Sequence, residues 1–227
     1  YNRRNKNVRL YELGNIYVAE ELPLAGLPDE RMQFTLGMYG EGDFYTMKGV
    51  VEEFFDKIGL HKKEVHDPKA GKPFLHPGRQ ANIIYDGKTV GYLGEVHPAV
   101  ADTYGIGERA YVAVLDMPSI EPFATFDRKY EGIAKYPAVN RDISMVIPKS
   151  VLAGQIEEII ENKGGSYLES CQLFDVYEGA QIKKGYKSMA YSIVFRAKDK
   201  TLEEADVASA MKRILKGLEA LDAELRQ

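Results

Sequence analysis

The alternation of apolar and polar residues predicts two adjacent β-strands in the second half of the chain. In residues 187–196 every second position is large and apolar, namely Met189, Tyr191, Ile193 and Phe195. The positions between them form the opposite face, namely Ser188, Ala190, Ser192, Val194 and Arg196. In residues 173–177, Phe174 and Val176 share one face, and the other face holds Leu173, Asp175 and Tyr177. Both strands therefore offer one buried face and one exposed face.

Three other stretches repeat apolar residues at helical spacing and are typical of helices that cover a sheet. The first stripe lies in residues 46–58 and comprises Met47, Val50, Val51, Phe54, Phe55 and Ile58. The second lies in residues 151–163 and comprises Leu152, Ile156, Ile159 and Ile160. The third follows Thr201-Leu202-Glu203-Glu204, which predicts a capping box, and comprises Ala208, Met211, Ile214, Leu215 and Leu218.

The order of elements in the second half predicts a split βαβ, ferredoxin-like fold. A strand over residues 140–147 precedes the helix of residues 151–163, the two strands above, the last helix and a short closing segment, residues 223–226. Both helices then cover one sheet face and leave the other open. A phenol beside a carboxylate and a hydroxyl on that face is suited to stacking on a nucleobase and reading its edge. An ordinary sheet with one face in water explains the same pattern.

The first half predicts a mostly antiparallel sheet, so the fold class is α+β. Strands are expected over residues 8–18, with a bulge or bend at Gly14, and over residues 31–39, 82–85, 89–98 and 111–116. Asp86-Gly87 predicts a hairpin turn, and residues 99–104 predict a short helix. Residues 117–136 are rich in proline and lack periodicity, which places a domain boundary there and gives domains of residues 1–128 and 129–227.

Composition narrows the class of protein without assigning a function. The 227 residues are 44% hydrophobic and 28% charged, as in an ordinary soluble globular protein. The net charge of −4 indicates that any RNA contact is local and assisted by other chains. The single cysteine, Cys171, excludes an internal disulfide framework, fits a reducing cytoplasm and is expected to be a packed thiol. The chain has no bilayer-length apolar run and no signal-peptide pattern, and its start at Tyr1 suggests a fragment of a longer polypeptide.

Two short motifs in the first half carry little chemical information. His76, Glu95 and His97 offer imidazole and carboxylate ligands, but the two histidines precede turn prolines, so we expect structural roles for them and assign no metal. The string of residues 105–109, Gly-Ile-Gly-Glu-Arg, precedes a strand where a nucleotide site would require a helix N-terminus. We therefore expect a turn.

A series of longer motifs runs through both halves in a fixed order. The first half contains Asp43 to Gly49, His76 to Ala81 and Gly91 to Pro98. The second half contains Tyr136-Pro137 through Arg141-Asp142, Leu173 to Tyr177, Gly185 to Ser188, Thr201-Leu202 and Glu224 to Arg226. These motifs resemble the C-terminal part of the β subunit of bacterial phenylalanyl-tRNA synthetase, which ends in a ferredoxin-fold anticodon-binding domain.

The resemblance implies a class II synthetase-like first domain, an antiparallel sheet flanked by helices, that has lost its chemistry. The complete enzyme would use ATP and Mg²⁺ on its catalytic α subunit, the partner of this chain in an α2β2 heterotetramer, and this fragment would hold no cofactor and no catalytic residue. The second domain would bind the anticodon of phenylalanine tRNA. Tyr177 would stack on a base, Asp175 and Ser188 would bond its edge, and Arg141 and Arg196 would contact phosphates or bases.

Two other functions remain open at this point. Ferredoxin-like units also serve as regulatory modules that sense small molecules, which predicts saturable amino-acid binding by residues 130–227 alone. A hydrolase that uses His76, Glu95 and His97 predicts loss of zinc on His97→Ala. Fold-level likeness does not separate these functions, because one fold hosts many activities.

Overall fold

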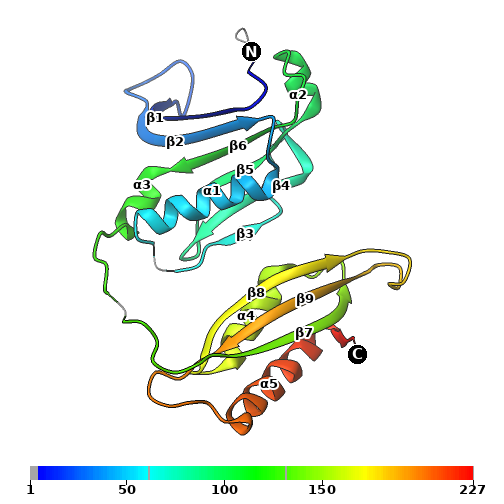
Figure 1. Ribbon diagram of the computed structural model, residues 1–227. Helices are drawn as coiled ribbons and strands as arrows, with labels where there is room; N and C mark the ends of the chain where they lie inside the picture. Colours follow the sequence, from blue (N-terminus) through cyan, green and yellow to red (C-terminus); the bar gives the residue numbers. More distant parts are fainter. Residues whose placement is uncertain (1–4, 61, 131, 227) are drawn as a thin grey trace. The chain divides into compact units, whose positions relative to one another are not determined.

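Two separate hydrophobic cores divide the chain into two units, residues 1–129 and 130–227 (Figure 1). The computed structural model describes residues 5–60, 62–130 and 132–226. Each unit is built on its own antiparallel sheet and is described by itself below.

The first unit contains a six-stranded sheet in the order β1-β2-β6-β5-β4-β3, with every neighbouring pair antiparallel. Its strands are β1 (Val8–Val18), β2 (Asp29–Tyr39), β3 (Val65–Asp67), β4 (Leu75–Tyr85), β5 (Lys88–Val96) and β6 (Ala110–Asp116). The hairpin between β4 and β5 is confirmed, because Asp86 and Gly87 both take the left-handed conformation that such a two-residue turn requires. The sheet has the antiparallel pairing that the residue pattern predicts.

Helix α1 (Phe44–Lys57) covers one face of this sheet and contacts β5 and β6 (Figure 1). Its first turn is fixed by Asp43, whose carboxylate accepts the backbone N–H of Thr46 at 2.8 Å while the Thr46 hydroxyl accepts the N–H of Asp43. The helix buries Met47, Val51 and Phe55. The short elements α2 (Pro98–Thr103), α3 (Met117–Ile120) and the 3₁₀ turn Glu121–Phe123 complete the unit.

Three features of the first unit differ from the sequence pattern or add to it. Pairing of β1 with β2 continues without a shift through Gly14, so there is no bulge at that residue. Strand β4 begins at Leu75, before the expected start of the strand at residue 82, and its early part pairs with β5 across a register shift. The proline-rich segment starts with a structured turn, because Ile120 is fully buried in the first core.

The second unit has the predicted ferredoxin-like topology. Its elements are β7 (Val139–Pro148), α4 (Ala153–Gly164), β8 (Leu168–Tyr177), β9 (Tyr186–Phe195), α5 (Glu204–Leu218), the 3₁₀ turn Glu219–Leu221 and β10 (Glu224–Leu225). The strand order is β10-β7-β9-β8, so the last strand does complete a four-stranded sheet. That strand is short, and it pairs with β7 only through Glu224 opposite Val146 and Leu225 opposite Met145.

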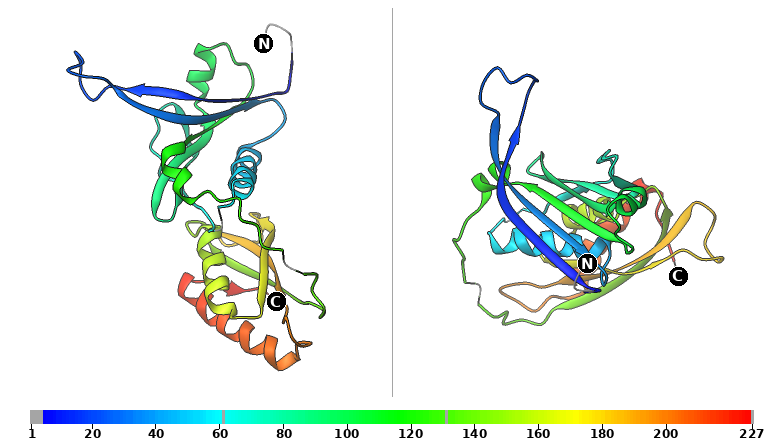
Figure 2. Two further views of the ribbon diagram at one scale, coloured as in Figure 1. Left: turned by 90° about the vertical axis from the view of Figure 1, so that its left-hand side faces the viewer. Right: turned by 90° about the horizontal axis from the view of Figure 1, so that it is seen from above.

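Both helices of the second unit lie on one face of its sheet, as Figure 2 shows in the left-hand view. The core between them consists of alternate strand residues, including Met145, Tyr191 and Ile193, and of the inner faces of α4 and α5. The buried face of α5 is shifted from the one that the apolar stripe predicts. It buries Val207 and Ala210, and Ala208 is exposed.

The cap of α5 also differs from the expected capping box. The helix begins at Glu204, two residues later than a cap at Thr201 would place it. The backbone N–H of Glu203 donates to Asp206 at 3.2 Å, which satisfies one of the free donors at this end.

A β-bulge in β8 changes the faces expected for residues 173–177. Leu173 pairs with Tyr191 and Asp175 pairs with Ala190, so Phe174 is an extra residue with no partner of its own. Leu173 therefore packs against the core, whereas Phe174 is 58% exposed. The expectation that Phe174 belongs to the buried face is wrong, because a strict alternation cannot anticipate an inserted residue.

Two phenylalanines of adjacent strands provide a test of this arrangement. We expect Phe195→Ala to lower the free energy of unfolding by about 3–5 kcal/mol, because Phe195 is fully buried in the second core. The matched variant Phe174→Ala should cost less than about 1 kcal/mol, as for other exposed positions. Urea unfolding of both variants measures the difference. Equal losses would contradict the bulge.

Candidate nucleic-acid interface

Asp175 and Tyr177 lie on the sheet face of the second unit that the helices leave uncovered. Tyr177 pairs with Ser188 and Asp175 pairs with Ala190, so all four residues share a face. The next residue of β9, Met189, points the opposite way into the core. The Tyr177 side chain is 40% exposed, so its ring is available at the surface as expected.

Ser188 is placed on the predicted face but is only 5% exposed, whereas the sequence suggested an exposed hydroxyl. It lies on a central strand between Tyr177 of β8 and Val146 of β7. A small side chain flanked by two larger neighbours has little surface of its own. A ligand can therefore reach the Tyr177 ring directly, and it reaches the Ser188 hydroxyl only beside that ring.

The position of the Tyr177 ring depends on a glycine in the loop between β8 and β9. A Cβ atom built on Gly179 would overlap the phenol oxygen and Cζ of Tyr177. The phenol thus lies against backbone where only a residue without a side chain fits. A larger residue at position 179 would therefore displace the ring.

Lysines surround this end of the sheet although the whole chain is acidic. Lys183 and Lys184 are exposed in the same loop, and the Lys183 ammonium lies 4.7 Å from the centre of the Tyr186 ring. Lys149 follows β7, and its backbone N–H donates to the carbonyl of Gly185 at 2.9 Å. Its ammonium forms an ion pair with Glu178 at 2.5 Å, which lowers the pKa of that carboxyl. These three lysines against one glutamate make a local positive region suited to phosphate.

The structure does not bring the two predicted arginines to this place. Arg196 shares the open face but is eight residues along β9 from Ser188, or about 27 Å at the usual rise of a strand. Its guanidinium donates to Glu169 at 3.0 Å and to the carbonyl of Tyr136 at 2.9 Å. Its interactions are thus with the other end of the sheet.

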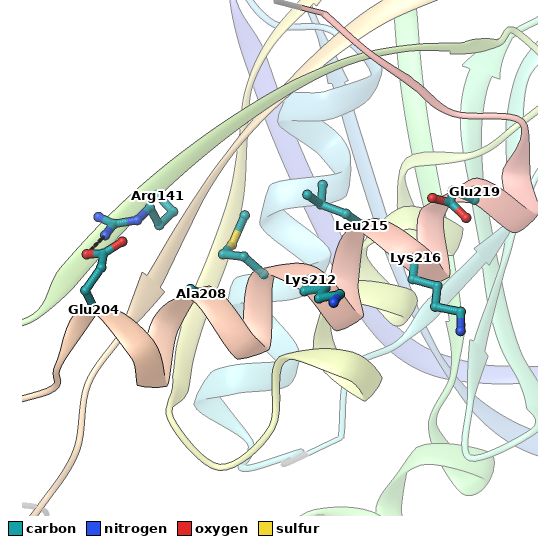
Figure 3. Close-up of a pocket in the computed structure, with 8 residues that line it drawn as sticks. Arg141, Glu204, Ala208, Lys212, Leu215, Lys216 and Glu219 are labelled. Carbon is teal, nitrogen blue, oxygen red and sulfur yellow. Dashed lines mark hydrogen bonds and ion pairs between the residues drawn. The ribbon is translucent and has the colours of Figure 1, made fainter.

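Arg141 lies on the side of the sheet that the helices cover, because it pairs with the core residue Ile193. It forms an ion pair with Glu204 of α5 at 2.6 Å and lines a hollow along that helix with Met211 and Leu215 (Figure 3). Arg141 therefore lies on the opposite face of the sheet from Tyr177, and the RNA contact expected for it stays a prediction. Side chains alternate between the two faces along β7, and this places Arg141 on the face that the helices cover.

The sequence reasoning missed Gly179 and the three lysines. The Lys-Lys-Gly string of residues 183–185 was a visible signal, but its position beside Tyr177 follows only from the length of the hairpin. Cys171, in contrast, behaves as expected, since it faces the core side of β8 and packs against it.

The set His76, Glu95 and His97 does not form a metal-binding group in the described part of the chain. Glu95 is buried and receives two hydrogen bonds from the guanidinium of Arg79. Nδ1 of His76 accepts the backbone N–H of Gly78 at 3.1 Å, and Nδ1 of His97 accepts that of Ala99 at the start of α2. The structural roles expected for the two histidines are confirmed. The string of residues 105–109 forms the expected turn before β6.

The fold defines an α+β protein whose second unit is a ferredoxin-like module with an exposed aromatic ring, Tyr177, on its open sheet face. Comparison with protein families gives two matches that follow the two units. Residues 1–117 match the phenylalanyl-tRNA synthetase β chain CLM domain, and residues 134–226 match the ferredoxin-fold anticodon-binding domain. The chain belongs to the phenylalanyl-tRNA synthetase β chain family.

Curated relatives named phenylalanine–tRNA ligase β subunit are similar along the whole chain. The protein of Clostridium tetani is 40% identical over 227 residues, and that of Clostridium acetobutylicum is 39% identical over the same length. The protein of Streptococcus agalactiae is 38% identical over 237 residues. These alignments cover 100%, 100% and 99% of this chain but only 28%, 28% and 29% of the relatives. The chain thus spans less than a third of the length of these relatives.

A solved pyrrolysyl-tRNA synthetase from Desulfitobacterium hafniense is 12% identical and aligns with a TM-score of 0.41 over 53% of this chain and 43% of its own. That similarity is too low to support an argument about fold. Within the described residues, no helix has both the length and the apolar content needed to cross a membrane.

The ion pair between the partly exposed Arg79 and the buried Glu95 generates a prediction about pH. The hydrogen bonds from Arg79 hold the pKa of the Glu95 carboxyl below its ordinary value of 4.5. Its contribution to stability is therefore complete above that value and is lost as the pH falls toward the lower pKa of the folded state. We expect Glu95→Gln to lower the free energy of unfolding by about 1–3 kcal/mol near neutral pH.

The difference between the native chain and Glu95→Gln should shrink as the pH is lowered below about 4.5, and urea unfolding at neutral and acidic pH measures it. Glu41→Gln, at an exposed position, serves as the control. A difference that stays constant or grows in acid would contradict the charged pair.

Proposed function

We propose that the chain is the C-terminal part of a phenylalanine–tRNA ligase β subunit, and that its second unit binds the anticodon loop of phenylalanine tRNA. The family matches and the names of the relatives support this assignment. The observation that carries it is the exposed Tyr177 ring on a sheet face opposite the helices, beside a local group of lysines.

Each residue of the open face has a proposed role. Unpaired bases of an RNA loop stack on aromatic rings, so Tyr177 would hold one anticodon base. Asp175 accepts hydrogen bonds from the amino groups of bases, and Ser188 would bond the same base beside the ring. Lys149, Lys183 and Lys184 would contact phosphates of the loop. Arg196 would contact RNA only if the bound strand extends along β9.

We assign the first unit a class II synthetase-like fold without catalytic chemistry. Its antiparallel sheet with a covering helix supports that fold. The catalytic α subunit of an α2β2 enzyme would be its partner in the cytoplasm, and the complete enzyme would use ATP and Mg²⁺ there. Large apolar side chains exposed along β1 and the following loop are of the kind that a partner protein covers, namely Leu10, Tyr11, Leu13, Tyr17, Leu22 and Leu27.

The alternative of a small-molecule sensor is not favoured. The model that matches residues 134–226 is described by anticodon binding. The hydrolase alternative loses its basis, because Glu95 is occupied by Arg79 and each histidine by a backbone N–H.

Replacing the aromatic ring tests the proposed function directly. Stacking of a base on an aromatic side chain contributes about 1–3 kcal/mol, so Tyr177→Ala should weaken binding of the phenylalanine anticodon stem-loop by about 5- to 150-fold. Fluorescence anisotropy with a labelled stem-loop measures the dissociation constant. Tyr104→Ala, which removes an exposed ring from the first unit, is the control and should leave binding unchanged. Equal affinity of both variants would reject the assignment of Tyr177.

A second variant tests the position of the ring without removing it. Gly179→Ala should push the phenol aside and weaken stem-loop binding by roughly 3- to 30-fold, part of the stacking contribution, with little loss of stability. Gly154→Ala is the matched control, because its added methyl group meets no atom within 4 Å. Native affinity in Gly179→Ala would show that RNA binding does not depend on the position of the Tyr177 ring beside residue 179.

A further inference from the structure

A group of metal-ligating side chains lies away from the open face, in the first unit between α1 and β3. Glu52 is on α1, one turn after Lys48, so both point to the same side of the helix. Glu64 and His66 are two residues apart at β3, so both lie on one face of that strand. One oxygen of each glutamate and one nitrogen of His66 all lie within 4.8 Å of one another.

His66 gives this group a property that an ordinary ion-pair cluster lacks. Its Nε2 atom is buried and has no hydrogen-bond partner, and it is the one buried side-chain nitrogen or oxygen in this condition in the described part of the chain. A buried polar atom without a partner costs about 1–3 kcal/mol, and such atoms are rare in native proteins. Burial lowers the pKa of His66 to about 4, so the imidazole is neutral near pH 7.

We propose that Glu52, Glu64 and His66 bind one zinc ion. One imidazole nitrogen and two carboxylate oxygens are ligands that zinc accepts, and three protein ligands leave a fourth position for water. An imidazole ligand favours zinc over magnesium or calcium, which prefer oxygen alone. Nε2 of His66 thereby gains the partner that the protein does not supply.

The bound ion would join two elements that otherwise have little to hold them together. Strand β3 is at the edge of the sheet and pairs with β4 through only three residues, Val65 to Asp67. A metal shared by α1 and β3 would tie this edge to the helix. The zinc would therefore stabilise the first unit, and its role would be independent of RNA binding.

Lys48 provides the competing explanation for the same cluster. Its ammonium forms an ion pair with Glu52 on the next turn of α1. The ion pair satisfies Glu52, but Nε2 of His66 still has no hydrogen-bond partner. Zinc would take the place of the ammonium as the positive charge beside the two glutamates.

Titration of the metal-stripped 227-residue chain with Zn²⁺ against a chromophoric chelator tests the proposal. We expect one site, weakened on the order of 10- to 100-fold by His66→Ala and also by Glu52→Gln, a substitution at a partly exposed helix position that leaves the fold intact. His76→Ala and His97→Ala remove histidines outside the cluster and should leave the affinity unchanged. Binding that is absent, or that survives both ligand variants, would overturn the proposal.

Two further measurements separate a built site from surface binding of zinc. Lys48→Met removes the competing ammonium and should tighten zinc binding several-fold, whereas unchanged or weaker binding would contradict a shared position. Saturating Zn²⁺ should raise the melting temperature of the native chain and not that of His66→Ala. An equal rise in both would show that the metal binds elsewhere.

Discussion

Burial of a single sheet face by two helices is the constraint on which the second unit depends. Residues of β7 and β9 such as Met145, Tyr191 and Ile193 supply the apolar layer that α4 and α5 cover. Because side chains alternate along a strand, each buried residue places its neighbours on the other face. That face has no helix on it, and its residues are free to contact a partner.

Two local features of the backbone determine which side chains lie on the open face. The bulge at Phe174 shifts β8 by one residue, so that Leu173 enters the core while Asp175 and Tyr177 remain on the open side. Gly179 then lets the phenol of Tyr177 lie against the loop backbone. Without the bulge, Leu173 would share a face with Asp175, and an apolar side chain would be exposed for no structural gain. The arrangement of side chains on the open face therefore depends on one inserted residue, Phe174, and on the missing side chain of Gly179.

Local periodicity allowed most elements of the fold to be predicted, because alternation and helical spacing depend only on neighbouring residues. The clean alternation of residues 187–196 and the stripe of residues 151–163 placed their elements correctly. Features that depend on pairing between distant strands were missed. The bulge at Phe174, the burial of Ser188 between two strands and the side on which Arg141 lies each follow from register.

Clusters that form only by tertiary packing could not be predicted from the sequence either. Glu52 and Glu64 are separated by the end of α1 and a connecting segment, and only the approach of the helix to an edge strand brings them to His66. The sequence instead drew attention to His76 and His97, which precede prolines and accept the backbone N–H groups of Gly78 and Ala99. Spacing along the chain cannot distinguish a histidine whose ring nitrogen accepts a nearby backbone N–H from one whose buried nitrogen has no hydrogen-bond partner.

The central claim is that RNA meets the second unit on the sheet face that α4 and α5 leave open. Amide chemical shifts of the isotope-labelled chain, recorded while the phenylalanine anticodon stem-loop is added, test it most directly. The account predicts that perturbed residues cluster at Asp175, Tyr177 and Ser188 and in residues 178–185. Perturbations confined to the outer surface of α5, around Ala208 and Lys212, would contradict it.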